Sequence, residues 1–234
     1  MSSPPGLSVI LPVLNQAVHI GEVVEGYRAV LLTLNVPFEM ILVVNGSRDD
    51  SLAVCSGLAA RFPDIVALES SPPGWGLAVR TGLARARGRL VCYTNSARTD
   101  PERLKKFVAY GLRNPGVVIK ANRRRHKDSV YRRLGSLLFN VQCRALFDLP
   151  MWDVNGTPKV FPGELVPRLD LRFDDDLIDL EFNVRCNALE AEMLEVPVFF
   201  TRRHGGRSTT SWRSALKLYW GALRFWLRER RSRS

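Results

Sequence analysis

Short apolar runs alternate with segments of helical periodicity through the first half of the chain, and this alternation constrains the fold more than any other feature. Leu7–Leu14, Met40–Val44 and Leu90–Tyr93 are nearly continuous apolar runs, as expected for strands buried on both faces of a sheet. Between them, apolar residues recur at intervals of three and four. The pattern predicts an α/β fold with a Rossmann-like, mostly parallel central sheet and helices on both faces.

The remaining elements follow from the same signals. Ile65–Leu68, Val117–Lys120 and Met193–Phe200 are predicted strands, and Ser51–Phe62, Leu77–Ala86, Ser129–Phe147 and Leu177–Leu189 are predicted helices. Asp100 followed by Pro101 marks another helix start. We expect one domain over residues 1–210 and a basic amphipathic C-terminal helix with its tail over 211–234.

In parallel sheets, ligands bind at the carboxyl ends of the strands. Three predicted strands end in Asn15-Gln16, Asn45-Gly46-Ser47 and Thr94-Asn95-Ser96. These segments, here called the rim, are the expected functional edge of the sheet. The rim segments contain amides and hydroxyls but no carboxylate.

The net charge of +11 indicates an acidic partner: phosphorylated substrates, an anionic membrane or nucleic acid; basic solubility alone is the other interpretation. No nucleic-acid-binding module is recognisable, so we expect no nucleic-acid partner. The four cysteines have no metal-site or disulfide spacing, and we expect reduced, buried thiols in a cytoplasmic protein. Met1–Gly6 is too short for a signal peptide, and no apolar stretch approaches the length of a membrane span.

Three segments together resemble glycosyltransferase family two. They are SVILPVLNQ (8–16), MILVVNGSRDDS (40–51) and the stretch from Gly74 to Glu102, in the order and spacing of that family's inverting enzymes. Residues 178–209 look like a segment of the dolichyl- and polyprenyl-phosphate sugar synthases. The resemblance covers residues 7–210 and implies the type A nucleotide-diphospho-sugar transferase fold.

The resemblance implies that the rim binds a nucleotide-sugar donor. The donor-binding residues that it implies are Pro12, Asn15, Gln16, Asn45, Ser47, Arg80, Thr94, Asn95 and Ser96. The chain departs from the family at its acidic positions: Gln16 replaces a glutamate, Asn45 follows Val44 where two aspartates are usual, and Thr94 and Ser96 replace the metal-binding Asp-x-Asp pair. Asp49 retains a family acidic position.

Magnesium and manganese prefer charged oxygen ligands, which Thr94 and Ser96 do not supply. We therefore expect no metal held by the protein at this position, although donor phosphates and water could still hold Mg²⁺ or Mn²⁺. Two interpretations remain open. Either cations such as Arg48, Arg80 and Arg98 neutralise the diphosphate, or the donor site is inactive.

The resemblance also implies an acceptor site. Its candidate residues for a lipid phosphate are Arg123, Arg132, Ser136, Arg203 and Ser208. Arg132 and Ser136 are four residues apart, on one face of a predicted helix, and arginines suit phosphate through bidentate hydrogen bonds. The alternative is that these arginines form salt bridges with the acidic run Asp174–Asp176.

Two carboxylates are the catalytic candidates. Asp179 and Glu181 lie where the family keeps acidic residues near the acceptor, and either could orient the acceptor or act as a base. A phosphate acceptor is already ionised near pH 7, so a strong base is not required. A structural ion pair is the alternative.

The last helix places aromatic and aliphatic side chains on one stripe: Trp212, Ala215, Leu216, Tyr219, Trp220, Leu223, Trp226 and Leu227. Basic residues lie elsewhere on it. This combination is typical of a helix in the membrane interface, and residues 212–228 are expected to bind an anionic membrane. Docking on the chain's own domain or on a partner subunit is the alternative.

The resemblance therefore implies a glycosyltransferase that moves a sugar from a nucleotide donor to a polyprenyl-phosphate or similar lipid-linked acceptor, with inversion. It is expected to lie on the cytoplasmic side, peripherally on the inner membrane face. The alternative is an inactive protein of the same fold that binds a lipid phosphate or a partner enzyme.

Overall fold

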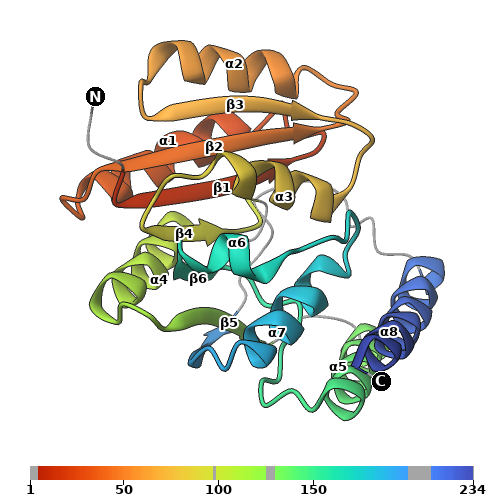
Figure 1. Ribbon diagram of the computed structural model, residues 1–234. Helices are drawn as coiled ribbons and strands as arrows, with labels where there is room; N and C mark the ends of the chain where they lie inside the picture. Colours follow the sequence, from red (N-terminus) through yellow and green to blue (C-terminus); the bar gives the residue numbers. More distant parts are fainter. Residues whose placement is uncertain (1–4, 97–98, 125–129, 200–211, 234) are drawn as a thin grey trace.

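The computed structural model describes residues 5–96, 99–124, 130–199 and 212–233 (Figure 1). Its strands are β1 (Leu7–Val13), β2 (Phe38–Asn45), β3 (Ile65–Ser70), β4 (Leu90–Tyr93), β5 (Val118–Arg124), β6 (Lys159–Pro162) and β7 (Met193–Phe199). Its helices are α1 (Ile20–Leu32), α2 (Ser51–Arg61), α3 (Trp75–Arg85), α4 (Pro101–Arg113), α5 (Val130–Phe147), α6 (Leu165–Leu169), α7 (Ile178–Ala188) and α8 (Trp212–Arg233).

The strands form one sheet in the order β3-β2-β1-β4-β6-β5-β7. β1, β2, β3 and β4 pair in parallel, and so do β5 and β7. β6 is antiparallel to both of its neighbours, β4 and β5. The predicted mostly parallel α/β fold is confirmed, and the one reversed strand joins the first half of the sheet to the second.

Helices cover both faces of the sheet. The apolar stripes of α1, α2 and α4 pack on one face, through residues such as Tyr27, Cys55 and Phe107. α3, α6 and α7 cover the other face, through residues such as Val79 and Phe182. The four cysteines are unpaired and buried, as predicted.

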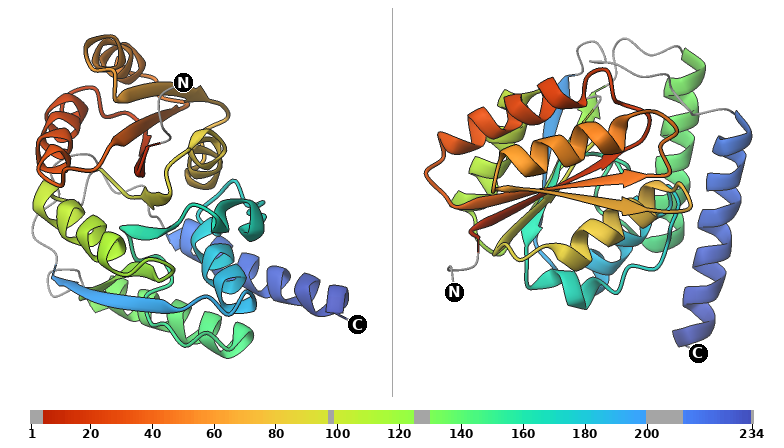
Figure 2. Two further views of the ribbon diagram at one scale, coloured as in Figure 1. Left: turned by 60° about the vertical axis from the view of Figure 1, so that its left-hand side comes forward. Right: turned by 90° about the horizontal axis from the view of Figure 1, so that it is seen from above.

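A third apolar core joins α5, α7 and α8. Phe139 of α5, Leu180 of α7 and Phe225 of α8 belong to it. α5 and α8 lie side by side and run in the same direction, because Phe139 meets Tyr219 and Phe147 meets Phe225 (Figure 2). β1, β2 and β3 point toward the side of the molecule on which α8 lies, so this helix pair is on the side of the rim (Figures 1 and 2).

The start of α3 differs from its prediction. α3 begins at Trp75 rather than Leu77, and Gly74 has an extended backbone with φ of −174°. A Cβ atom at Gly74 or Gly76 would collide with the backbone oxygens of Phe173 and Asp174. The two glycines therefore allow the segment 173–175 to approach α3. α6 had no counterpart in the sequence prediction.

Candidate functional site

The loops after β1 and β2 are joined by hydrogen bonds. The backbone N–H of Asn15 donates to Ser47 Oγ at 3.0 Å, and the backbone N–H of Arg48 donates to Asn15 Oδ1 at 2.8 Å. The Gln16 N–H donates to Ser51 Oγ at 2.8 Å. Asn15 has a φ of 52°, in the left-handed region that asparagine tolerates. The structure thus brings three of the predicted donor residues together.

Asp49 anchors this pair of loops. Its Oδ2 accepts from the Ala17 N–H at 2.9 Å, and its Oδ1 accepts from both the N–H and the hydroxyl of Ser51. Partial desolvation opposes ionisation, but these hydrogen bonds from Ser51 and Ala17 outweigh it and hold the pKa of Asp49 below its usual value. Asp49 is the acidic family position that the chain retains here, and both of its carboxylate oxygens are therefore engaged in hydrogen bonds within the loops.

The hydroxyls that replace the Asp-x-Asp carboxylates are already paired inside the protein. Thr94 Oγ1 lies 2.8 Å from Thr99 Oγ1, and Ser96 Oγ donates to Gln16 Oε1 at 2.6 Å. Both side chains are fully buried. No group of three His, Cys, Asp or Glu side chains suited to a metal occurs in the described part of the chain. These residues do not fit a divalent metal site.

Two further donor candidates lie nearby in the fold. Asn45 ends β2 and is buried, and its Oδ1 has no hydrogen-bond partner among the described residues. Pro12 lies within β1, opposite Val43. Asn45 thus offers an unused acceptor atom at the rim, next to Gly46, which has a φ of +64°.

Arg80 extends from α3 to the segment before α7. Its Nη1 forms an ion pair with Asp174 and also donates to the carbonyl of Arg172 at 3.2 Å. One alternative in the sequence analysis was that the acidic run Asp174–Asp176 forms salt bridges with the acceptor arginines. In the structure, Asp174 forms its ion pair with Arg80, which is a donor-binding candidate.

Asp179 is the centre of a buried network that joins the two halves of the chain. It forms an ion pair with Lys159 of β6 and accepts from the Tyr93 hydroxyl at 2.9 Å and from Trp75 Nε1 at 3.2 Å. Tyr93 ends β4, and Trp75 begins α3. Asp179 itself is 5% exposed. Its two carboxylate oxygens are therefore engaged with the protein rather than open to a substrate.

Lys159 is completely buried in the middle of this network. Burial lowers the pKa of its ammonium group to about 8, and the neighbouring Asp179 carboxylate limits the fall. The aromatic rings of Tyr93 and Phe182 lie 5.1 and 5.7 Å from the Lys159 Nζ atom. The ammonium group thus depends on one carboxylate and two rings.

Glu181 is also completely buried. Its Oε2 accepts from the backbone N–H groups of Arg172 and Phe173 at 2.8 and 2.9 Å. Its Oε1 has no partner among the described residues. Glu181 therefore holds the segment that also carries Asp174 and faces away from solvent.

Arg123 is held by Asp153. The guanidinium Nε and Nη2 donate to the two carboxylate oxygens at 2.7 Å each, and the backbone N–H of Arg123 donates to the same carboxylate at 2.8 Å. Although burial opposes it, the Arg123 guanidinium holds the pKa of Asp153 well below its usual range. The carboxylate that pairs with Arg123 is thus Asp153, whereas the alternative in the sequence analysis named residues 174–176.

A second buried lysine supports this pair. Lys120 Nζ forms an ion pair with Glu195 at 2.6 Å and donates to the carbonyl of Asp153. Burial lowers the pKa of Lys120, and the Glu195 carboxylate opposes that change. Glu195 also accepts from the backbone N–H groups of Trp152 and Asp153. β5 and β7 therefore fix the position of the arginine.

The other acceptor candidates are only partly described. Ser136 lies half-buried in α5, where its carbonyl accepts from Asn140. Arg132 belongs to the same helix, but its side chain lies outside the described residues, as do Arg203 and Ser208. The structure therefore describes Ser136 within α5 and leaves the rest of this group as a prediction.

Sequence reasoning missed Trp75, Tyr93, Lys120 and Glu195. One signal was present. Lys120 and Lys159 are charged residues at buried strand positions, where apolar residues are usual. A charged residue there requires a buried partner, but its identity depends on contacts between distant parts of the chain.

Comparison with known proteins places this arrangement in a family. Residues 8–163, well over half of the chain, match the sequence family described as Glycosyl transferase family 2. The chain belongs to glycosyltransferase family 2. The matched segment of this family 2 protein contains β1 to β6, and with them the rim and Lys159.

Similar curated proteins are undecaprenyl-phosphate 4-deoxy-4-formamido-L-arabinose transferases. The one from Pectobacterium atrosepticum is 26% identical over 223 residues, which cover 93% of this chain and 66% of that protein. The one from Pseudomonas aeruginosa strain LESB58 is 30% identical over 165 residues, which cover 68% of this chain and 48% of that protein. This family 2 chain thus spans less than two thirds of the length of these relatives.

Solved structures confirm the type A glycosyltransferase fold. Glucosyl-3-phosphoglycerate synthase from Mycobacterium tuberculosis, in complex with Mn²⁺, uridine diphosphate and glucosyl-3-phosphoglycerate, superposes with a TM-score of 0.70 at 16% identity. The superposition covers 94% of this family 2 chain and 77% of that one. At this identity the likeness shows the fold alone.

Proposed function

We propose that this protein transfers a sugar from a nucleotide-sugar donor to a polyprenyl-phosphate or similar lipid-linked acceptor, with inversion. The names of the curated relatives, aligned over 93% of the chain, support this class of acceptor. The observation that carries the proposal is the position of Asp179, which is bonded to α3 and β4 on the donor side and to β6 on the acceptor side. A transferase needs both sites to be held against each other in this way.

In the proposed reaction, an oxygen of the acceptor phosphate attacks the anomeric carbon of the sugar. The new carbon–oxygen bond forms on one side as the bond to the nucleotide diphosphate breaks on the other, and the diphosphate takes the electron pair. The acceptor phosphate is ionised near neutral pH, so no proton has to be removed first. The charge that develops on the diphosphate is the part of the reaction that needs stabilisation.

Arginines are proposed to supply that stabilisation. The donor would lie along Pro12, Asn15, Gln16, Asn45, Ser47, Thr94, Asn95 and Ser96, with Arg80 at its diphosphate. The acceptor phosphate would be bound by Arg123, Arg132, Ser136, Arg203 and Ser208. Arg80 would have to exchange Asp174 for the diphosphate. Arg123 is held in a fixed orientation by Asp153, which suits a residue that positions a substrate phosphate.

Asp179 and Glu181 are proposed to act through other groups. Because both are buried, Asp179 would position Lys159, Tyr93 and Trp75, and Glu181 would hold the backbone of Arg172 and Phe173. Neither role requires a proton transfer. Their importance would lie in keeping the donor and acceptor sides in register.

Metal independence is a direct test of this proposal. Because the Thr94 and Ser96 hydroxyls are buried and bonded within the protein, EDTA should leave the transfer rate unchanged within error. Calorimetry with a panel of nucleotide sugars, each with and without Mg²⁺, measures donor binding separately. Donor binding that requires Mg²⁺ would contradict the metal-independent mechanism.

The same titrations test the second candidate function. Because the Thr94 and Ser96 hydroxyls are hydrogen-bonded within the protein, they also suit an inactive family 2 protein that binds a lipid phosphate or a partner enzyme. Failure of every donor to bind, while an isoprenyl phosphate still binds, would favour this candidate and remove the transferase proposal.

We further propose that α8 and α5 together rest on an anionic membrane surface, at the inner membrane face. Seven large apolar side chains on the two helices are 44% to 63% exposed, here called the α5–α8 surface: Leu134, Leu137, Leu138, Val141, Leu216, Trp220 and Leu227. α8 docks on its own domain through Ala222 and Phe225, which are buried, so the same helix has a docked face and an exposed apolar face. No described helix has the length and apolarity of a membrane span.

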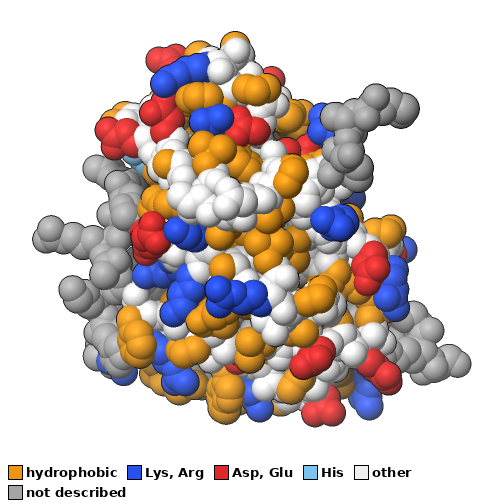
Figure 3. Space-filling view, turned by 90° about the vertical axis from the view of Figure 1, so that its left-hand side faces the viewer, with side chains coloured by type: hydrophobic (Ala, Val, Ile, Leu, Met, Phe, Trp, Pro, Cys, Tyr) orange, Lys and Arg blue, Asp and Glu red, His pale blue; other side chains and the backbone are white. Residues whose placement is uncertain are grey.

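The charged side chains near the α5–α8 surface are consistent with membrane binding, but charge alone does not identify this face. Lys217, Arg224 and Arg228 are exposed on α8, where they would meet anionic lipid head groups. Basic side chains are also spread over the opposite side of the molecule (Figure 3), so net charge alone does not mark a membrane face. In this proposal residues 1–210 form the transfer domain and residues 211–234 attach it to the membrane.

Replacing Leu137 and Leu138 by glutamate should weaken binding to vesicles that contain anionic lipid by about tenfold or more, because two half-exposed apolar side chains lose their burial in lipid. Co-sedimentation with the vesicles measures this. Leu32→Glu is the matched control, since Leu32 is 50% exposed on α1, away from the α5–α8 surface. Equal loss in both variants, or none in either, would contradict the assignment.

A further inference from the structure

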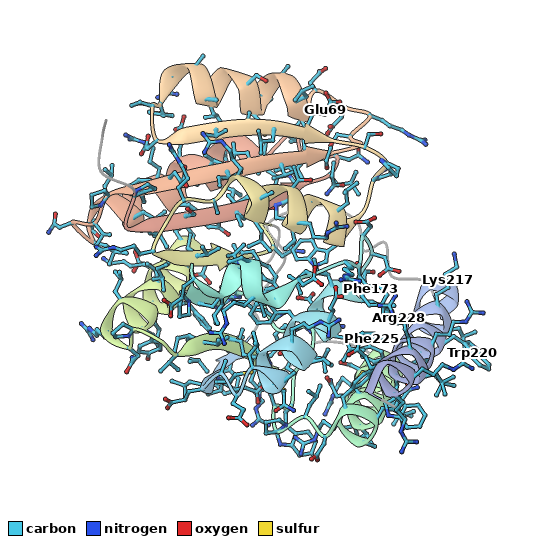
Figure 4. The ribbon with its side chains drawn as sticks, in the orientation of Figure 1. Glu69, Phe173, Lys217, Trp220, Phe225 and Arg228 are labelled. Atoms are coloured by element: carbon cyan, nitrogen blue, oxygen red, sulfur yellow. The ribbon has the colours of Figure 1, made fainter. Side chains whose placement is uncertain are left out.

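A groove runs between α8 and the segment that precedes α7. Its volume is about 910 Å³. Phe173 and Leu177 line it from the segment, and Leu216, Trp220 and Phe225 line it from α8. Figure 4 shows Phe173 beside α8, close to Phe225 and Arg228. The groove therefore has apolar walls on both sides and lies on the side of the molecule that holds the rim.

Close packing of the helix shapes this groove. Phe173 and Phe225 meet edge to face with ring centroids 5.1 Å apart. Gly221 has no side chain, and a Cβ atom there would collide with Leu177, so α8 lies directly against the segment at this point. The glycine and the aromatic pair fix the base of the groove, while Trp220 and Leu216 remain 63% and 51% exposed at its edge.

The charges at the groove are mainly positive. Among the described residues that line it, Lys217, Arg224 and Arg228 are positively charged and Asp175 is negatively charged. Asp175 accepts from the backbone N–H of Leu177. Among the described residues, neither Lys217 nor Arg224 has an ion-pair partner, and Arg228 lies over the Phe173 and Phe225 rings at 5.4 and 5.6 Å. Such a groove favours an apolar chain that carries an anionic head group.

We propose that this groove binds the isoprenoid chain of the phosphate acceptor. The inference deepens the proposed function and rests on it for the identity of the ligand. Phe173 supports the choice of occupant, because its backbone N–H is bonded to Glu181, one of the residues assigned to the transfer site. A chain in the groove would therefore lie against a wall that the transfer site itself holds in place.

The test uses the full chain in solution with monomeric farnesyl phosphate, isopentenyl phosphate and inorganic phosphate, measured by calorimetry. Farnesyl phosphate should bind at least about tenfold more tightly than isopentenyl phosphate, because only the longer chain fills the groove. Farnesol should bind more weakly than farnesyl phosphate, since it lacks the anionic head group. Equal affinity for the two phosphates would overturn the proposal.

Variants locate the binding. Trp220→Ala and Leu216→Ser, both at exposed positions, should each remove most of the preference for the longer chain. Leu138→Ser with Val141→Ser, on the neighbouring helix, should leave it intact. Equal losses in both sets would place the ligand on the general α5–α8 surface and overturn the groove assignment. Dodecyl phosphate binding as tightly as farnesyl phosphate would show that the groove takes straight lipid chains instead, which would also overturn it.

Failure of the groove and failure of the proposed function are distinguishable. If chain-length preference is present but no nucleotide sugar binds, the groove stands and the transferase proposal fails. If donors bind and transfer to isopentenyl phosphate occurs without any chain-length preference, the transferase stands and the groove fails.

Discussion

Replacing Asp179 by alanine should lower the free energy of unfolding by about 3–5 kcal/mol, because it leaves the ammonium group of Lys159 buried without its counter-charge. The loss also removes the acceptor for the Tyr93 hydroxyl and for Trp75 Nε1. Urea denaturation at pH 7, followed by circular dichroism, measures the change. We expect this substitution to have the largest effect on stability, because it leaves a buried charge and two buried donors without their partner.

The control removes both charges together. The double variant Lys159→Met with Asp179→Asn keeps a hydrogen-bond acceptor but has no buried charge, and it should be much more stable than Asp179→Ala. An equal loss of stability in the double variant would show that packing or hydrogen bonding, rather than the unpaired charge, is responsible.

The pH dependence gives a second check on the same residue. The folded chain releases the Lys159 proton near pH 8, whereas the unfolded chain keeps it to pH 10.5. Between these values the unfolded state binds more protons, so the contribution of this group to stability rises with pH. The lysine is mostly neutral at pH 9, and Asp179→Ala should therefore cost less there than at pH 7. A larger cost at pH 9 would contradict the assigned role of the charge.

Replacing Arg80 by alanine should reduce the affinity for a nucleotide-sugar donor by about 10- to 100-fold, the usual effect of losing a charged hydrogen bond to phosphate. Asp174→Asn should act in the opposite direction, because Asp174 occupies the guanidinium in the absence of donor. Calorimetry with the donor selected from the panel measures both variants.

Arg85→Ala is the matched control for this experiment. Arg85 lies on the same helix, and its side chain is 38% exposed against 37% for Arg80, but it faces Glu39 rather than the segment before α7. Donor affinity should be unchanged in this variant. Equal losses in Arg80→Ala and Arg85→Ala would indicate a general effect of charge and remove Arg80 from the donor site.

The first half of the fold could be predicted because its information is local. Continuous apolar runs such as Leu7–Leu14 specify strands buried on both faces, and the cap at Asp100 specifies where α4 begins; its side chain accepts from the Arg103 N–H at 2.8 Å. The neutral residues at Thr94 and Ser96 were also visible in the sequence. That their hydroxyls are already paired was not, because Gln16 lies 80 positions away from Ser96.

The partners in the candidate site were beyond local reasoning for the same reason. Asp179 meets Trp75 across 104 positions and Lys159 across 20, and no periodicity carries that information. Pairing of the acidic run 174–176 with the acceptor arginines was one alternative from the sequence; in the structure Arg123 pairs with Asp153, and Arg80 pairs with Asp174. Pairing of charges depends on which elements pack together, and that is decided by the whole fold.

The last helix shows a different limit. Its 3.6-residue periodicity correctly indicated an amphipathic helix, but the stripe of large side chains coincides only in part with the face that docks: Tyr219 of the stripe packs against Phe139 of α5. Ala222 and Phe225 are buried, and Gly221 lies against Leu177, while Trp220 and Leu216 stay exposed. Small residues allow close approach, so a hydrophobic pattern alone did not identify the contact face.

The segment 172–176 connects the proposed donor site with the groove. Its Asp174 forms an ion pair with Arg80, and its backbone packs against Gly74 and Gly76. Its backbone N–H groups donate to Glu181, and its side chains form one wall of the groove. If a ligand on either side shifts this segment, the two ligands are thermodynamically linked. Each then changes the affinity for the other by the same factor, so that filling the groove and freeing Arg80 become reciprocal steps.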